Sequence, residues 1–487
     1  MGVLPLKSGS YNAEQGRGGM PMDNILQVNE RLRGLIWGAP MLILLLGTGL
    51  YFTAVTGVFQ VRYCALWLRK TLFSCFTGAA RRTSGGVSPF AAMCTALAAT
   101  VGTGNIAGVA TALTLGGPGA VFWLWVSAFV GMMTAFAENT LGMLYREKGC
   151  DGSWRGGAML YLKNGLRSPL LAGAFALFCV LASFGIGNMS QCNSIAQGLY
   201  SSFGISSGIV GTVTAVLLGA VLLGGLKRLS RVTETLVPFM ALFYMAGCVV
   251  ILCINHAAII PAFKSIFVAA FDPQSILGGA AGITVREAMR YGVARGLFSN
   301  EAGMGSTPHA HALANVDCPH DQGVVAMIGV FIDTFVVLTL NALVIISTLY
   351  TADGPLASGY VGDITGVLGK ANLAQTAFGV VFGESAGNMF VAVCLFFFAF
   401  STILSWNLFG KINMVYLFGK KSASVYTLLA LIFIFLGTTM SNDLVWELSD
   451  MLNQLMVIPN AIALLALTSH VVKHSHTPDR LSGRENG

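Results

Sequence analysis

The sequence predicts an all-α polytopic membrane protein, and three observations support this prediction. The 487 residues are 55% hydrophobic and only 10% charged, with a mean hydropathy of +0.71, whereas about 25% of residues in soluble domains are charged. Apolar runs recur along the chain, and ~20 apolar residues suffice to cross a bilayer as a helix. The net charge of +7 arises from Lys and Arg residues that fall mainly between these runs. A lipid bilayer is therefore the expected environment, and nothing points to nucleic acid.

Eleven transmembrane helices are predicted from hydropathy. A polar tail, 1–33, precedes the first apolar run, which is too long for the apolar region of a signal peptide and is therefore predicted to be a retained span. The spans are 35–58, 88–115, 119–145, 170–200, 207–226, 232–254, 280–313, 323–351, 385–417, 423–440 and 448–472.

The distribution of basic residues predicts the orientation. With the amino terminus outside, the cytoplasmic segments carry nineteen Lys and Arg residues and the outer segments carry six. Basic residues concentrate in cytoplasmic loops, so we expect the amino terminus outside and the carboxyl-terminal tail, 473–487, inside. Arg286, Arg290 and Arg295 belong to neither set, because they lie in the outer half of the seventh span.

The spans divide into two sets of five after an extra first helix with its cytoplasmic loop, 34–87. The first set covers 88–256 and the second covers 280–472, with an extracellular loop at 257–279 between them. Because five is odd, the second set enters the membrane from the opposite side, which is typical of a 5+5 inverted repeat. Each set opens with a glycine-interrupted span, broken at 100–105 and at 298–303 respectively.

The two interruptions predict a binding site. Non-helical backbone at membrane depth is tolerated only where protein buries it or where it lines a watery cavity. The N–H groups after a break suit a carboxylate, and the carbonyls before it suit an ammonium group or Na⁺. The expected carboxylate donors are the backbone N–H groups of Thr103 and Gly104. The expected ammonium acceptors are the carbonyls of Thr100 and, across the cavity, of Phe298 or Ser299. Close packing of small residues between helices is the alternative.

Two segments carry a resemblance to a known family. The chain resembles the alanine or glycine:cation symporter family. The likeness is clearest in the segments ATVGTGNIAGV (99–109) and GLFSNEAGMGSTPHAHA (296–312), and it covers essentially the whole chain. That family resembles the bacterial leucine transporter in fold. The resemblance implies a secondary transporter in the plasma membrane of a prokaryote that moves alanine, glycine and D-alanine inward with Na⁺ or H⁺. It implies no organic cofactor.

The resemblance also implies a principal Na⁺ site. Its ligands would be the carbonyls of Ala98 and Val101 before the first break, and on the ninth span the carbonyl of Phe398 and the hydroxyls of Ser401 and Thr402. Oxygen ligands are what a hard cation requires. Hydrogen bonds from these hydroxyls to their own helix are the alternative.

Three amides are further candidates. Asn105 resembles the residue that contacts a second Na⁺ in the leucine transporter, with Ser299 as the matching residue on the seventh span; otherwise Asn105 serves the substrate or the break. In the leucine transporter a tyrosine also binds the substrate carboxylate. In this chain Gln191, or Asn188 three residues earlier, would take that role. Interhelical hydrogen bonding is the alternative for Gln191 and Asn188.

Several ionisable residues lie within predicted spans, where each is by default a functional hypothesis. Asp333 or Glu301 would carry a proton in an H⁺-coupled transporter, or would neutralise an arginine such as Arg295. The three arginines of the seventh span would line a vestibule or pair with carboxylates such as Glu287. The remaining intramembrane carboxylates are Glu138, Glu234, Glu447 and Asp450.

A different class of function is a membrane-embedded, metal-dependent enzyme that uses His309 and His311. Residues two apart on a helix point to different faces, which disfavours a shared metal ion. No GxxxxGK[ST] motif occurs in the sequence, which argues against an ATP-driven pump.

Overall fold

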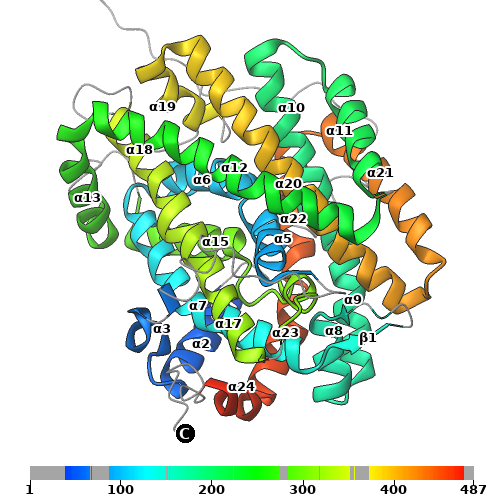
Figure 1. The fold of residues 1–487 in the computed structure, drawn as a ribbon. Helices are drawn as coiled ribbons and strands as arrows, with labels where there is room; N and C mark the ends of the chain where they lie inside the picture. Colours follow the sequence, from blue (N-terminus) through cyan, green and yellow to red (C-terminus); the bar gives the residue numbers. More distant parts are fainter. Residues whose placement is uncertain are drawn as a thin grey trace, which may run out of the picture.

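The computed structural model describes residues 39–68 (66 excepted), 87–274 (150, 151, 153 and 223 excepted), 283–350 (317 excepted), 356 and 372–475. Helices form nearly all of this part of the chain (Figure 1). The predicted tail 1–33 and most of the tail 473–487 lie outside the described residues.

The described helices follow the predicted spans closely. The first half contains α2 (Ala39–Val55), α3 (Phe59–Arg62), α5 (Pro89–Thr100), η1 (Thr103–Asn105), α6 (Ala107–Gly116), α7 (Gly119–Leu144), α8 (Ala158–Leu160), η2 (Tyr161–Gly165), α9 (Pro169–Phe184), η3 (Gly185–Met189), α10 (Ser190–Phe203), α11 (Ser207–Leu222), α12 (Gly225–Ile254) and α13 (His256–Phe271). The second half contains α15 (Val285–Asn300), α16 (Pro308–His311), α17 (Pro319–Val330), η5 (Phe331–Leu338), α18 (Thr339–Leu349), α19 (Asn372–Phe382), α20 (Glu384–Phe418), α21 (Ser422–Thr439), α22 (Asn442–Gln454), α23 (Val457–Ala466) and α24 (Thr468–Ser475). Strands β1 (Glu147–Lys148) and β2 (Trp154–Arg155) pair antiparallel.

Within the described residues, seven helices are long and apolar enough to span a membrane, and an eighth span results if the bent pair α5 and α6 is counted as one. Four shorter apolar helices accompany them: Pro40–Val55, Ser207–Leu222, His256–Phe271 and Asn372–Phe382. The structure therefore supports a polytopic helical protein, while the count of eleven spans and the 5+5 arrangement stay predictions.

The first predicted break is present. Helix α5 ends at Thr100, and the chain resumes after a bend of 59° as η1 and α6. Every residue from Ala91 to Leu113 is buried, so this non-helical backbone lies inside the protein, as its polar groups require.

The second break lies slightly later than predicted. Helix α15 continues through Asn300, and the chain leaves it at Glu301, which has a left-handed φ of 56°. Gly303 (φ 94°) and Gly305 (φ 74°) follow before the short helix α16. The predicted break at 298–303 is thus shifted, because the positive-φ residues that end the helix are 301, 303 and 305. Phe298 and Ser299 belong to the last helical turn.

Two helices occupy segments that were not predicted as spans. The predicted extracellular loop 257–279 contains α13, which begins at His256, and the connection before α20 contains α19. Both are apolar, and Ile260 of α13 is 80% exposed.

The interior is centred on α5, which lies near the middle of the molecule (Figure 1). Large apolar side chains are exposed on the peripheral helices, including Val216, Leu242 and Leu428, as expected of a surface that faces lipid. β1 and α8, from a loop predicted to be cytoplasmic, lie at the same end of the molecule as α24, which joins the predicted last span to the carboxyl-terminal tail (Figure 1). Helix α19 lies at the opposite end.

Candidate functional site

The first break brings the backbone close to α20. Gly102 has no side chain, and a Cβ atom there would lie 2.3 Å from Thr402 Oγ1, so only glycine permits this approach. The Gly102 N–H donates to Asn105 Oδ1 at 3.0 Å, which stabilises the turn between α5 and η1. The sequence TVGTGN therefore produces both the break and its contact with α20.

Four of the five predicted Na⁺ ligands converge at this contact. The Thr402 hydroxyl lies 2.9 Å from the Ala98 carbonyl oxygen and 3.1 Å from the Phe398 carbonyl oxygen. The Ser401 hydroxyl lies 2.8 Å from the Phe398 oxygen and 3.5 Å from the Ala98 oxygen. Val101 is buried directly after α5, and its N–H donates to the Leu97 carbonyl. All four oxygens are buried and neutral. Both hydroxyls bond to the Phe398 carbonyl of their own helix, which was the alternative to an ion site, and both also reach the Ala98 carbonyl of α5. The Na⁺ site therefore stays a prediction.

The two breaks meet through side chains. The Ser299 hydroxyl, at the end of α15, lies 3.3 Å from Asn105 Oδ1 and 3.2 Å from Asp333 Oδ1. Asn105 Nδ2 donates to Asp333 Oδ1 at 2.6 Å. A Cβ atom on Gly104 would lie 3.5 Å from Ser299, so the backbone of the first break rests on the second. Asp333 is on the π-helical segment η5, and such segments are frequent at functional sites.

Gln191 contacts the predicted carboxylate position. Its Oε1 atom accepts from the Thr103 hydroxyl at 3.1 Å and from the Thr103 N–H at 3.4 Å, while its Nε2 atom donates to the Ile186 carbonyl. Asn188 instead accepts a hydrogen bond from Asn407 of α20 at 2.7 Å. The structure thus brings Gln191 to the break and directs Asn188 toward a neighbouring helix.

Arg295 and Asp450 form an ion pair on the α15 side of the site. An Arg295 nitrogen lies 3.2 Å from Asp450 Oδ2, and the guanidinium lies over the rings of Phe298 and Trp446. The hypothesis that Arg295 neutralises Asp333 or Glu301 is therefore wrong. Arg286 and Arg290 are exposed, and Glu287 caps its own helix through Thr284.

The loop after Glu301 is held by two carboxylates noted in the sequence, Glu301 and Glu138, and by three residues that sequence reasoning missed: Ser306, Trp406 and Asn460. Glu301 accepts hydrogen bonds from Ser306 and from the indole of Trp406, the latter at 2.9 Å. Glu138 accepts from the Gly305 N–H and from Asn460. Asn460 could have been found from the sequence, because it is a polar residue in the middle of a predicted span. Nothing in the sequence distinguished Trp406.

The histidines of the second break do not share a ligand position. His309 contacts Ser306 and Asn413, and His311 contacts Gln322 at 2.6 Å. Among the described residues, no group of three or more His, Cys, Asp or Glu residues could hold a metal ion.

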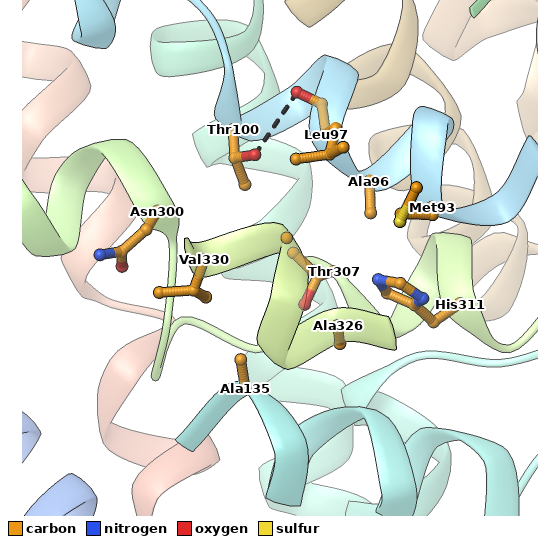
Figure 2. Close-up of a pocket in the computed structure, with 11 residues that line it drawn as sticks. Met93, Ala96, Leu97, Thr100, Ala135, Asn300, Thr307, His311, Ala326 and Val330 are labelled. Carbon is orange, nitrogen blue, oxygen red and sulfur yellow. Dashed lines mark hydrogen bonds between the residues drawn. The ribbon is translucent and has the colours of Figure 1, made fainter. Parts of the chain in front are cut away.

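A pocket lies beside the two breaks, between α5, α7, α16 and α17 (Figure 2). Thr100 and Asn300, at the ends of the two interrupted helices, border one end of it, His311 borders the other, and Thr307 lies between them. The rest of the lining is apolar: Met93, Ala96, Leu97, Ala135, Ala326, Gly329 and Val330. Thr100, predicted to face the substrate ammonium, therefore borders open space.

The chain is similar to known transport proteins over most of its length. Residues 22–480 match the model of the "Sodium:alanine symporter family". The chain is 43% identical over 458 residues to the sodium/alanine symporter AgcS of Methanococcus maripaludis, covering 93% of this chain and 97% of that one. It is 35% identical over 445 residues to the amino-acid carrier protein AlsT of Bacillus subtilis, with 90% of each chain covered. A crystal structure of MhsT in complex with L-phenylalanine superposes with a TM-score of 0.58 at 14% identity, covering 79% of this chain and 91% of that chain. This likeness shows the leucine-transporter fold.

Proposed function

This chain belongs to the sodium:alanine symporter family, and on that premise we propose that it imports small neutral amino acids together with Na⁺. The family and the relatives are transporters rather than enzymes, so the hypothesis of a membrane-embedded enzyme is wrong. Alanine, glycine and D-alanine are the proposed substrates, and alternating access around the two breaks is the proposed mechanism.

One observation carries the proposal: the Ser401 and Thr402 hydroxyls meet the Ala98 and Phe398 carbonyls beside the first break. Four neutral oxygens suit a hard monovalent cation, and the Val101 carbonyl would complete the set. A cation there would join α5 to α20, and so fix the helix that carries the break. Binding of Na⁺ and binding of substrate would thereby favour one another.

The substrate would lie at the break itself. Its carboxylate would accept from the Thr103 and Gly104 N–H groups at the start of η1, where the helix dipole favours negative charge. In the structure the Thr103 N–H donates to the Gln191 side-chain oxygen. The substrate carboxylate would take the place of that oxygen, and Gln191 would turn its NH₂ group toward the carboxylate. The ammonium group would lie near the carbonyls of Thr100, Phe298 and Ser299.

The energy available from one Na⁺ suffices for accumulation. A single charge that moves down 100 mV releases about 2.3 kcal/mol. This corresponds to roughly a fifty-fold concentration ratio, before the Na⁺ concentration gradient is added.

Uptake into proteoliposomes tests the proposal. Labelled alanine should accumulate inside when an inward Na⁺ gradient is imposed, and should only equilibrate when K⁺ replaces Na⁺. Accumulation that follows a proton gradient and ignores Na⁺ would contradict Na⁺ coupling. A panel of unlabelled amino acids added as competitors would then rank alanine, glycine and D-alanine.

A further inference from the structure

The two interrupted helices are joined at the end of the molecule that is predicted to be cytoplasmic. Val87, just before α5, and Ala314, shortly after α16, form an isolated parallel β-bridge. The Asn315 N–H donates to the Val87 carbonyl at 2.9 Å. Backbone segments that are far apart in the sequence, one from each broken span, are thereby paired directly.

Arg146 strengthens this joint from a third helix. It follows α7, and its guanidinium donates hydrogen bonds to the carbonyls of Ala312 at 3.2 Å, Ala314 at 2.5 Å and Val316 at 2.8 Å. An arginine presents its N–H donors in a fixed planar arrangement, which suits several acceptors at once. One side chain therefore holds the segment after α16, including the residue that is bridged to Val87.

A strand pair fixes the position of Arg146. Strand β1 begins directly after it and pairs with β2, and the Arg146 guanidinium lies 3.9 Å from the centre of the Trp154 ring on β2. An aromatic ring is a favourable partner for a guanidinium. The chain after β2 packs against the joint as well, since a Cβ atom on Gly156 would lie 2.0 Å from the Cβ of Ala312. The strand pair thus orders the side chain that makes the three hydrogen bonds.

Side-chain hydrogen bonds also link the two half-helices to the surrounding helices. On α5, the Thr95 hydroxyl lies 3.0 Å from that of Thr233 on α12, and the Thr95 carbonyl accepts from Ser405 of α20 at 2.8 Å. On α16, His309 contacts Asn413 of α20 at 2.7 Å.

When the site opens to the predicted cytoplasmic side, either these links or the joint at Arg146 must break. Each link is a single hydrogen bond, whereas Arg146 makes three. Hydrogen bonds to a charged group are roughly twice as strong as neutral ones. The joint at Arg146 is therefore the connection that is expected to persist.

We propose that Arg146 is a positioning residue for transport, which clamps the start of α5 to the end of α16 so that the two half-helices move as one unit. The alternative is that α5 swings out alone and breaks the bridge between Val87 and Ala314. The inference rests on the proposed function and goes beyond it, because it states which parts of the two broken spans stay together.

A disulfide across the bridge tests the proposal. Residues paired in a β-bridge have Cα atoms about 5 Å apart, and a disulfide accepts separations of about 4.4–6.8 Å. Val87→Cys with Ala314→Cys, in a background without the native cysteines, should therefore cross-link on oxidation. Alanine uptake into proteoliposomes should continue at the rate of the reduced protein. Uptake that stops on oxidation and returns on reduction would overturn the proposal.

A second disulfide, across the surface where the unit is expected to separate, is the matched comparison. Thr95→Cys with Thr233→Cys replaces two hydroxyls that lie 3.0 Å apart on α5 and α12. Its formation, followed by the loss of free thiols, should block uptake until it is reduced. If uptake continues with this disulfide formed, the unit does not move away from α12 and the proposal fails.

Arg146→Ala tests the clamp itself. Uptake should fall about tenfold or more, because hydrogen bonds to a charged group are lost, while alanine should still bind to the purified protein. Adding the disulfide between Val87→Cys and Ala314→Cys should restore uptake, since it replaces the clamp. Arg146→Lys should restore little, because an ammonium group lacks the planar set of donors.

Arg62→Ala is the control, since it removes an exposed arginine on the same predicted side of the membrane, and it should leave uptake unchanged. Wild-type uptake by Arg146→Ala, or uptake that stays low once the disulfide has formed, would overturn the proposal. If Arg146→Ala does not fold, the two disulfides decide the question in the protein that keeps Arg146. The proposed function fails on a different observation, namely wild-type protein that does not accumulate alanine under a Na⁺ gradient.

Discussion

Single side chains decide the chemistry at the centre of this molecule, and Thr402 is the clearest case. Its hydroxyl contacts the carbonyls of Ala98 and Phe398, and the absence of a side chain on Gly102 leaves room for it. The proposed ion ligand therefore lies directly against the backbone of the first break.

Thr402→Ala should weaken Na⁺ binding, because it removes one of few oxygen ligands. A lost contact to a charged group costs about 1.5–3 kcal/mol, so the Na⁺ concentration for half-maximal uptake should rise roughly 10- to 150-fold. Thr402→Ser keeps the hydroxyl and should stay close to wild type. Sodium titration of alanine uptake measures both variants, and equal values for Thr402→Ala and wild type would contradict the assignment.

Gly102→Ala should abolish Na⁺-dependent uptake while the protein still folds. The added Cβ would lie 2.3 Å from Thr402 Oγ1 and would displace that hydroxyl. Gly108→Ala on α6 is the control, since nothing lies within 4 Å of its Cβ, and replacing a helical glycine is usually stabilising. Uptake and thermal unfolding of both variants, compared in the same detergent, separate loss of the ion site from loss of the fold.

At the scale of elements, the second break depends on two buried carboxylates, Glu301 in the loop itself and Glu138 on α7. Glu301 adopts a left-handed conformation although it is not glycine, and its side chain is held by Ser306 and Trp406. Glu138 of α7 and Asn460 of α23 hold the backbone of Gly303 and Gly305. The loop is therefore held by hydrogen bonds from three neighbouring helices, α7, α20 and α23.

Trp406→Phe should destabilise the protein, since it leaves a buried Glu301 oxygen without its donor. An unsatisfied buried group costs about 1–3 kcal/mol, which should lower the unfolding temperature. Adding Glu301→Gln should not lower it by the full sum of the two single effects, because both remove the same contact. Additive effects in this double-mutant cycle would show that the hydrogen bond contributes nothing.

The sequence predicted the first break more accurately than the second, for a physical reason. In TVGTGN two glycines, two threonines and the asparagine that accepts from the Gly102 N–H lie within six residues. The position of the break can therefore be predicted from local sequence. In the second break the helix ends at a glutamate in a left-handed conformation, which only tertiary contacts to Trp406 and Ser306 support. The partner of Arg295 was also missed, because Asp450 is 155 residues away in the sequence.

At the scale of the whole molecule, transport requires that contacts between moving parts open and close. The Arg295–Asp450 ion pair joins α15, which carries the second break, to α22. Its two side chains are 16% and 11% exposed, so it lies just beneath the surface of the protein.

A cleavable thiol-specific cross-linker that joins Arg295→Cys to Asp450→Cys, in a background without the native cysteines, should therefore block uptake. A cross-linker is used because a direct disulfide needs Cα atoms within about 7 Å, closer than an arginine ion pair requires. Cleavage should restore uptake, apart from the loss caused by removing the charges. Each single cysteine variant treated with the same reagent is the control. Uptake that continues at the same rate with the cross-link formed would show that α15 and α22 do not separate during transport.

The central claim is that an ion held between α5 and α20 and an amino acid held at the breaks bind cooperatively. Calorimetric titration of alanine into the purified protein, in Na⁺ and in K⁺, measures this most directly. We expect alanine to bind at least tenfold more tightly in Na⁺, and alanine to tighten Na⁺ binding by the same factor, since coupling is reciprocal. Equal alanine affinities in the two salts would contradict the account.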